Sequence, residues 1–252
     1  MAVVLVTLSM ACASADTCQN NTLNNYLGAG YSCTIGDKVF SNFFVLFSGF
    51  HGDNAPAPIL PANSDVYVQP MTSGNSYGFL FTYMANDYVM YNQGLNLDID
   101  YLVTVTDARY AINSVFTQVT GGTQAPGGAV SGTKNLCLGG AFDNSGGFAS
   151  NTCPTGFGNS PGTAFVLGSS SNPATNDLYG TRSIANTTIL GVSDYVVLTG
   201  GSTTLTGKTA QINQMQNMFN QVLIQTGVPE PATFLLLGSA LLGLGVLRRK
   251  RV

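Results

Sequence analysis

Residues 99–105 read Ile99-Asp100-Tyr101-Leu102-Val103-Thr104-Val105, and their side chains alternate in character. Successive side chains of an extended strand point to opposite faces, so Ile99, Tyr101, Val103 and Val105 share one face. A strand with one apolar face is typical of an antiparallel sheet that packs on one side against a core. This stretch therefore predicts a fold built from half-buried β-strands.

Other short apolar and aromatic segments flank this stretch, and residues typical of turns separate them. They lie at 39–47, 66–68, 77–83, 88–91, 115–119, 130–138, 164–167, 182–190 and 195–199. About ten short strands in one chain predict an all-β fold, an antiparallel β-sandwich of jelly-roll-like type.

One segment carries a helical signal. Its apolar residues recur at intervals of 3, 4, 3 and 1, which is helical spacing. Asparagine and glutamine are frequent between them and are weak helix formers, so a final strand is favoured while a short helix stays open. The apolar residues are Ile212, Met215, Phe219, Val222 and Leu223.

The composition is that of an exported β-protein. Charged residues make up 8% of the chain, against a usual ~25%. Residues 16–227 hold five basic and eleven acidic residues, a net charge of −6. An acidic domain repels a phosphate backbone, so no nucleic-acid partner is expected.

The N-terminal segment resembles a secretory signal peptide. An apolar run at 2–8 is followed by Ala13-Ser14-Ala15, the small-x-small pattern of a cleavage site. We expect residues 1–15 to be removed and the mature chain to begin near Asp16. A positively charged n-region is missing, so the true start is expected upstream. The alternative is a buried N-terminal strand.

The C-terminal segment has three parts. Val228, Pro229, Glu230 and Pro231 form an extended stretch, because proline continues neither a helix nor a sheet. Residues 233–247 are uncharged and apolar, and as a separate hydrophobic helix they would span about 22 Å, less than the ~30 Å hydrocarbon core. The basic tail should stay on the cytoplasmic side of the membrane. It consists of Arg248, Arg249, Lys250 and Arg251.

This tripartite end resembles the PEP-CTERM sorting signal of Gram-negative bacteria. The resemblance implies recognition by an exosortase, a membrane-embedded transpeptidase-like enzyme, and removal of the tag at or near Pro229-Glu230-Pro231. It also implies a membrane-tethered precursor, then a place at the cell surface or in a matrix rich in exopolysaccharide. The domain division is then 1–15, 16–227 and 228–252. A simple tail anchor is the alternative.

The opening of the domain carries a second resemblance. Tyr26-Leu27, followed by Gly30-Tyr31-Ser32-Cys33-Thr34-Ile35-Gly36-Asp37-Lys38-Val39-Phe40-Ser41-Asn42-Phe43, is similar to the N-terminal region of PEP-CTERM proteins of unknown function. This similarity implies a β-sandwich export domain and says nothing about activity.

Four cysteines remain once Cys12 leaves with the signal peptide. An even number in an exported chain implies disulfides. Local closure favours Cys18–Cys33 and Cys137–Cys153 among three pairings. A zinc site needs closely spaced pairs such as Cys-x-x-Cys, which the chain lacks. We therefore expect no metal and no cofactor.

Two motifs resemble a catalytic and a nucleotide-binding site. Residues 74–78 match the Gly-x-Ser-x-Gly elbow around Ser76, but that elbow needs a later histidine, and His51 lies upstream. A tight turn explains the glycines more simply. Residues 207–209 resemble the end of a phosphate-binding loop, but Ser202 stands where its first glycine is required. We interpret this segment as a hairpin loop, and His51 as a loop residue.

Asp98 and Asp100 lie on one face at the expected start of a strand. Such a pair could bind Ca²⁺ or act as a glycosidase dyad. A solvated turn before the strand is the simpler interpretation.

These observations rank three functions. A non-enzymatic surface or matrix structural protein comes first. A carbohydrate-binding module or adhesin for exopolysaccharide is the alternative, because eleven tyrosines among polar residues could stack on sugars. A secreted glycan hydrolase that uses Asp98 and Asp100 comes last.

Overall fold

The computed structural model describes residues 15–84, 88–123, 128–143, 153, 158–159, 165–169, 176–201 and 209–224. Contacts divide the chain into two units, Met1–Val222 and Leu223–Val252. The first unit is built almost entirely from β-strands where it is described. Of the second unit, only Leu223 and Ile224 are described.

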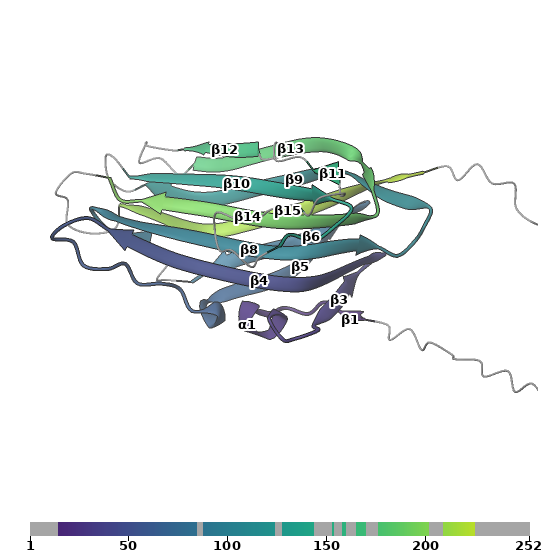
Figure 1. The fold of residues 1–252 in the computed structure, drawn as a ribbon, viewed down its shortest axis with the longest axis horizontal. Helices are drawn as coiled ribbons and strands as arrows, with labels where there is room; N and C mark the ends of the chain where they lie inside the picture. The colour runs from purple at the N-terminus through teal and green to yellow at the C-terminus, as the bar shows by residue number, and fades with distance from the viewer. Residues whose placement is uncertain are drawn as a thin grey trace, which may run out of the picture. The chain divides into compact units, whose positions relative to one another are not determined.

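The first sheet holds the alternating stretch at residues 99–105, which lies in one of its central strands. Its order among the described residues is β1-β3-β4-β8-β14-β10-β11, with β12 beside β10 (Figure 1). The short pair β1–β3 is parallel, and the other described strand pairs of this sheet are antiparallel. The strands are β1 (Asp16–Thr17), β3 (Ser32–Ile35), β4 (Lys38–His51), β8 (Gln93–Val105), β14 (Ile189–Thr199), β10 (Ala129–Leu138), β11 (Gly158–Asn159) and β12 (Phe165–Ser169).

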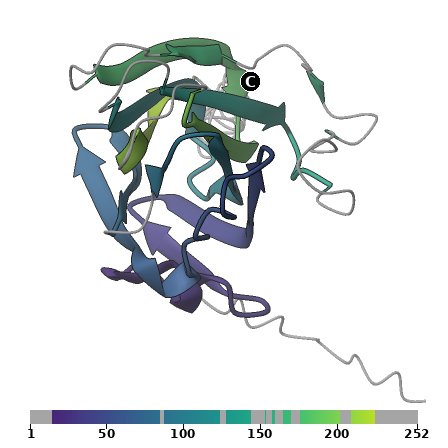
Figure 2. The ribbon, with the colours of Figure 1, turned by 90° about the vertical axis from the view of Figure 1, so that its left-hand side faces the viewer.

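The second sheet lies against the first, as the view along the strands shows (Figure 2). Its described order is β13-β9-β15-β6-β5-β2, with β7 beside β15. The strands are β13 (Asn176–Thr187), β9 (Tyr110–Thr123), β15 (Ala210–Leu223), β6 (Ser76–Tyr83), β5 (Val66–Ser73), β2 (Asn21–Thr22) and β7 (Tyr88–Val89). A short helix α1 (Leu23–Tyr26) and a 3-10 turn η1 (Asn63–Asp65) complete the described elements.

The core lies between the sheets and follows the alternation read from the sequence. Ile99, Tyr101 and Val103 of β8 are buried in it. Aromatic rings join the two sheets: the Phe40 and Phe79 centroids are 4.6 Å apart, and those of Tyr101 and Phe219 are 6.1 Å apart. Such edge-to-face contacts add to the burial of apolar area. The prediction of an all-β fold with two largely antiparallel sheets is confirmed.

The last described segment is a strand, as favoured. In β15, Met215 and Phe219 lie opposite Phe81 and Tyr77 of β6. Because side chains of a strand alternate between its two faces, Met215, Asn217 and Phe219 all point toward the core, and all three are buried. The helical spacing of the apolar residues was therefore misleading, because Asn217 occupies a core-facing position that a sequence pattern scores as polar.

The prediction of a single strand over residues 182–190 is wrong. Strand β13 ends at Thr187 in the second sheet, and β14 begins at Ile189 in the first sheet. The chain thus crosses between sheets at Thr188 without glycine or proline. The weaker signal there is the polar run Asn186-Thr187-Thr188, and the Ile189 amide donates to the Thr187 hydroxyl over 3.2 Å. Residues 195–199, expected as a separate strand, form the second half of β14.

Two predicted segments fall outside the described residues. These are the body of the signal peptide, up to residue 14, and the hydrophobic helix at 233–247. Among the helices that the structure does describe, none has the length and apolar character needed to cross a membrane.

Candidate functional site

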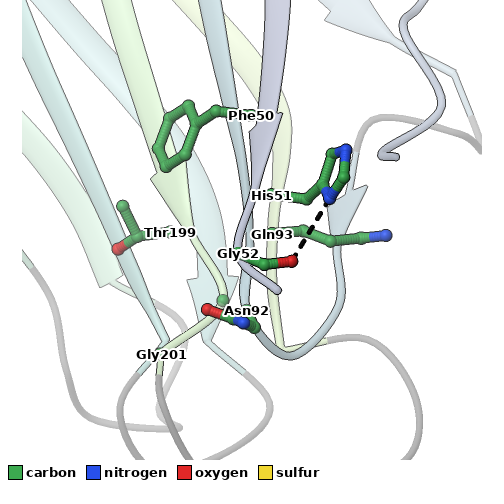
Figure 3. A pocket seen from close by; sticks show the side chains of 8 residues that line it. Phe50, His51, Gly52, Asn92, Gln93, Thr199 and Gly201 are labelled. Carbon is green, nitrogen blue, oxygen red and sulfur yellow. Dashed lines mark hydrogen bonds between the residues drawn. The ribbon is translucent and has the colours of Figure 1, made fainter. Parts of the chain in front are cut away.

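A hollow of about 550 Å³ lies at one end of the first sheet, where β4 ends, β8 begins and β14 ends (Figure 3). The antiparallel register brings these ends together: His51 lies opposite Gln93, and Thr199 lies opposite Gly94. Gly52 after β4, Asn92 before β8 and Gly200–Gly201 after β14 complete its rim. The lining residues are Phe50, His51, Gly52, Asn92, Gln93, Thr199 and Gly200–Gly201.

Phe50 provides an apolar surface in this hollow. Its ring rests on Gly94, where a Cβ atom would lie only 1.9 Å from the ring tip. Glycine in a central strand weakens the strand and often marks a close approach of another group. The ring stays 49% exposed. Phe50 and Thr199 lie on the same side of the strands, whereas His51 points to the other side (Figure 3).

Backbone hydrogen bonds tie the three segments of the rim together. The Gly52 amide donates to the Asn92 carbonyl over 2.9 Å, and the Asn92 amide donates to the Gly201 carbonyl over 3.0 Å. The Gly200 amide donates to the Gln93 carbonyl over 2.8 Å. Asn92 has a φ of 56°, a left-handed conformation that asparagine tolerates. The rim is therefore held in one geometry before any ligand arrives.

The hollow combines this apolar ring with neutral polar groups. Asn92 supplies an amide and Thr199 a hydroxyl, and the described lining contains no acidic, lysine or arginine side chain. The Nδ1 atom of His51 lies 3.2 Å from the Gly52 carbonyl oxygen, so this nitrogen is already engaged. The arrangement is suited to binding an uncharged ligand that has one apolar face and several hydroxyls.

The acidic pair Asp98 and Asp100 is not in a solvated turn, and that prediction is wrong. Both residues lie inside β8, and they are 1% and 2% exposed. They alternate with the core residues Ile99 and Tyr101, so they face away from the core between the sheets. Ser193 of β14 lies opposite Asp100 and donates a hydrogen bond to Asp98 over 3.2 Å.

The pKa of Asp100 is raised to about 9, chiefly by burial and then by the charge of the neighbouring Asp98. A hydrogen bond from Ser193 opposes the shift. Asp98 and Asp100 are in hydrogen-bond contact. The two carboxyl groups of a retaining glycosidase stand about 5–5.5 Å apart, and those of an inverting enzyme are farther apart. This contact does not match either separation. It suits a pair that holds a shared proton.

Ala141 and Phe142, in the segment that follows Cys137, lie beside Asp100. A smaller hollow of about 250 Å³ separates Asp100 and Val192 from Ala141 and Phe142. Gly191 permits the close approach, because a Cβ atom there would lie 2.5 Å from the Gly140 carbonyl oxygen. In sequence, the signal for this close approach was the Gly139-Gly140 pair directly after Cys137 and Leu138.

A second polar cluster, which the sequence did not reveal, joins the sheets through the core. Lys134 of β10 lies directly opposite Asp194 of β14, and the two form a buried ion pair. Asn217 of β15 donates to Asp194 over 2.6 Å, and Thr117 of β9 donates to Asn217 over 3.0 Å. Burial lowers the pKa of Lys134 and raises that of Asp194, and their contact opposes both shifts.

The structure places the predicted cysteines in two bonds. Cys18 is joined to Cys33, and Cys137 to Cys153, the local pairing that the spacing favoured. In the described part of the chain, no three histidine, cysteine, aspartate or glutamate residues gather as metal ligands would.

The motifs that resembled active sites serve local structure. Gly74-Asn75 is the two-residue turn of the β5–β6 hairpin, with a φ of 57° at Gly74, so the turn prediction is confirmed. Ser76 begins β6, and its hydroxyl donates to Asn220. Thr209 is buried and donates to the Val89 carbonyl over 2.9 Å. The rest of that glycine-lysine motif lies outside the described residues.

Other predicted site residues also fall outside the described part of the chain. Of the signal-cleavage pair, Ala13 lies outside it and Ala15 is its first residue. The processing motif and the basic cluster are outside it as well: Val228, Pro229, Glu230, Pro231, Arg248, Arg249, Lys250 and Arg251.

The C-terminal segment gives the informative comparison with known proteins. A family model described as "PEP-CTERM protein-sorting motif" matches residues 227–251. The chain is a PEP-CTERM sorting domain-containing protein. The matched range contains the Pro-Glu-Pro stretch, the apolar run and the arginine cluster, and it ends the chain apart from Val252. This sorting motif implies an exosortase as partner and a precursor held at the membrane before processing. The motif does not extend into the β-sandwich.

Comparison with curated proteins finds no sequence match. Among solved structures, the enzymatically active domain of tailspike protein 4 from bacteriophage CBA120 aligns with a TM-score of 0.25 and 7% identity. The alignment covers 71% of this chain but only 19% of that one. A likeness this low bears on neither fold nor function.

Proposed function

We propose that this protein is a non-enzymatic structural component of the cell surface or of an exopolysaccharide-rich, biofilm-type matrix. The single observation that carries the proposal is the sorting motif at 227–251, which follows a folded β-domain. The signal peptide at 1–15 starts export. A helix at 233–247 then holds the precursor in the inner membrane, with Arg248–Arg251 on the cytoplasmic side, until an exosortase removes the tag near Pro229-Glu230-Pro231.

The domain is suited to a life outside the cell. Two disulfides stabilise its edges, and disulfides persist in oxidising compartments. The residues that resembled catalytic groups are held in structural contacts: Ser76 donates a hydrogen bond to Asn220, and Asp98 and Asp100 are hydrogen-bonded to one another. These contacts favour a structural role over a hydrolase. A jelly-roll-like connection of the strands is part of the same proposal.

Recognition of exopolysaccharide is the second candidate. The observation that favours it is the exposed ring of Phe50 in a hollow that also carries an amide and a hydroxyl.

The processing step is tested by replacing Pro229, Glu230 and Pro231 with alanine in the native host. We expect the variant to be exported but to remain untrimmed and membrane-bound, because the segment that the processing enzyme recognises is lost. Tyr179→Ala, a substitution at an exposed position of β13, serves as the matched control and should be trimmed like the wild type. If the triple variant is trimmed as before, the proposed processing site is wrong.

A further inference from the structure

We infer that the hollow bounded by Phe50, Asn92 and Thr199 is a binding site for a neutral saccharide. The inference deepens the proposed function and rests on it only for export to a place where glycans are present. Binding itself depends on the geometry of the first sheet.

The setting of Phe50 is suited to stacking against a sugar ring. Single exposed apolar residues are common and need no explanation. Phe50 differs because its ring is seated on Gly94, so that its position is fixed while 49% of the residue remains exposed. A fixed, exposed ring is suited to the apolar C–H face of a sugar, which stacks on it without a large loss of side-chain freedom.

Polar groups lie beside the ring of Phe50. A pyranose presents hydroxyls around its edge, and these require donors and acceptors at the rim of the site. Thr199 lies two strands from Phe50 on the same face, with Gly94 between them. Asn92 adds an amide whose position is fixed against Gly52, where a Cβ atom would lie 2.3 Å from Nδ2. Because backbone hydrogen bonds hold this rim, its residues lose little conformational freedom when a ligand binds.

Charge decides which saccharides fit. The described lining contains no lysine or arginine to pair with a uronate or sulfate. Residues 16–227 are also net acidic, which repels polyanions. A neutral glycan meets neither obstacle. The volume of about 550 Å³ lies within the usual ~300–1,000 Å³ of small-ligand sites, which is room for a short segment of a glycan.

The test uses the full 252-residue chain, oxidised and kept in a zwitterionic detergent that has no sugar headgroup. Neutral gluco-, manno- and galacto-oligosaccharides are titrated by calorimetry, with oligogalacturonate as the acidic comparison. We expect at least one neutral oligosaccharide to bind saturably, with a dissociation constant on the order of 1 mM or tighter. Oligogalacturonate should bind more weakly.

Variants then assign the binding to the hollow. Phe50→Ala should weaken binding about tenfold and Phe50→Tyr should retain it, because the stacking surface is lost only in the first. Thr199→Val removes one hydroxyl at nearly constant size and should weaken binding about fivefold. Ile59→Ala alters a 60% exposed apolar residue that does not line the hollow, and it should bind like the wild type.

The inference is overturned if no neutral oligosaccharide binds the wild type, if acidic oligomers bind more tightly, or if Phe50→Ala and Thr199→Val bind normally. Near-ultraviolet circular dichroism of each variant checks its fold, and Thr199→Val keeps the test decisive if Phe50→Ala does not fold. The outcome is separate from processing. A chain that is trimmed in the host but binds no sugar contradicts this inference alone, and a chain that binds but is never trimmed contradicts the proposed function alone.

Discussion

Replacing Asp100 by asparagine should remove a large part of the pH dependence of the stability of this domain. Asp100 has a pKa of about 9 in the folded protein, against 3.8 for an ordinary aspartate, chiefly because it is buried. The folded state therefore binds a proton that the unfolded chain releases above pH 3.8. The stabilising contribution of this proton is fully present below pH 3.8 and is lost progressively as the pH rises toward about 9.

The magnitude follows from the size of the shift. Stability falls by about 1.4 kcal/mol per pH unit in this window, so the wild type loses about 4 kcal/mol between pH 3.8 and pH 7 through this group. Asparagine has nearly the same size and hydrogen-bonding capacity, but it does not titrate. The stability of Asp100→Asn relative to the wild type should therefore rise by about 4 kcal/mol from pH 4 to pH 7, or about 8–16 °C in unfolding temperature.

The assay is thermal unfolding of both full-length proteins at several pH values, followed by near-ultraviolet circular dichroism. Asp107→Asn is the matched control with the opposite sign, because Arg109 lowers the pKa of the partly exposed Asp107 to about 2. Without the Asp107 carboxylate, the variant should be slightly less stable than the wild type above pH 4. Parallel curves for the wild type and Asp100→Asn would refute the reasoning. So would a wild type that gains stability as the pH rises, or one that does so only with millimolar Ca²⁺.

Two further predictions concern groups that hold the sandwich together. Lys134→Met should cost about 3–5 kcal/mol because it leaves Asp194 buried without its cation, whereas Lys134→Met/Asp194→Leu should cost clearly less; equal losses in thermal unfolding would contradict a buried ion pair. Replacing both Cys137 and Cys153 with serine should lower the free energy of unfolding by about 3 kcal/mol, given their separation of 16 residues. By admitting water to Asp100, it should also reduce the pH-dependent difference in stability between proteins with aspartate and with asparagine at position 100. An unchanged difference would show that the segment between the two cysteines does not shield the carboxyl group.

The fold was largely predictable because most of its strands have a recognisable local sequence pattern. The alternation over residues 99–105 appears as the core face of β8, and the aromatic segment at 77–83 is β6. The paired cysteines were also accessible from spacing alone. The prediction failed at the crossing at Thr188, because the polar run Asn186-Thr187-Thr188 is a weaker turn signal than glycine or proline.

The polar interior was hidden for a different reason. Asp98, Asp100 and Lys134 have ionisable side chains that sequence reasoning assigns to solvent, and only the register shows which groups meet. Asp194 is buried because Lys134 lies directly opposite, and the two residues are 60 positions apart in sequence. The hollow at Phe50 was missed likewise, because Phe50, Asn92 and Thr199 come from three strand ends that only the sheet brings together.

The central claim is that residues between about 16 and 228 form an exported domain that is freed of both end segments. Intact mass spectrometry on protein recovered from the surface and medium of the native host tests it most directly. The account predicts a species that begins near Asp16 and ends between Val228 and Pro231, with a mass lower by 2 Da for each disulfide. A full-length C-terminus that remains in the membrane fraction would contradict it and would indicate a tail-anchored protein.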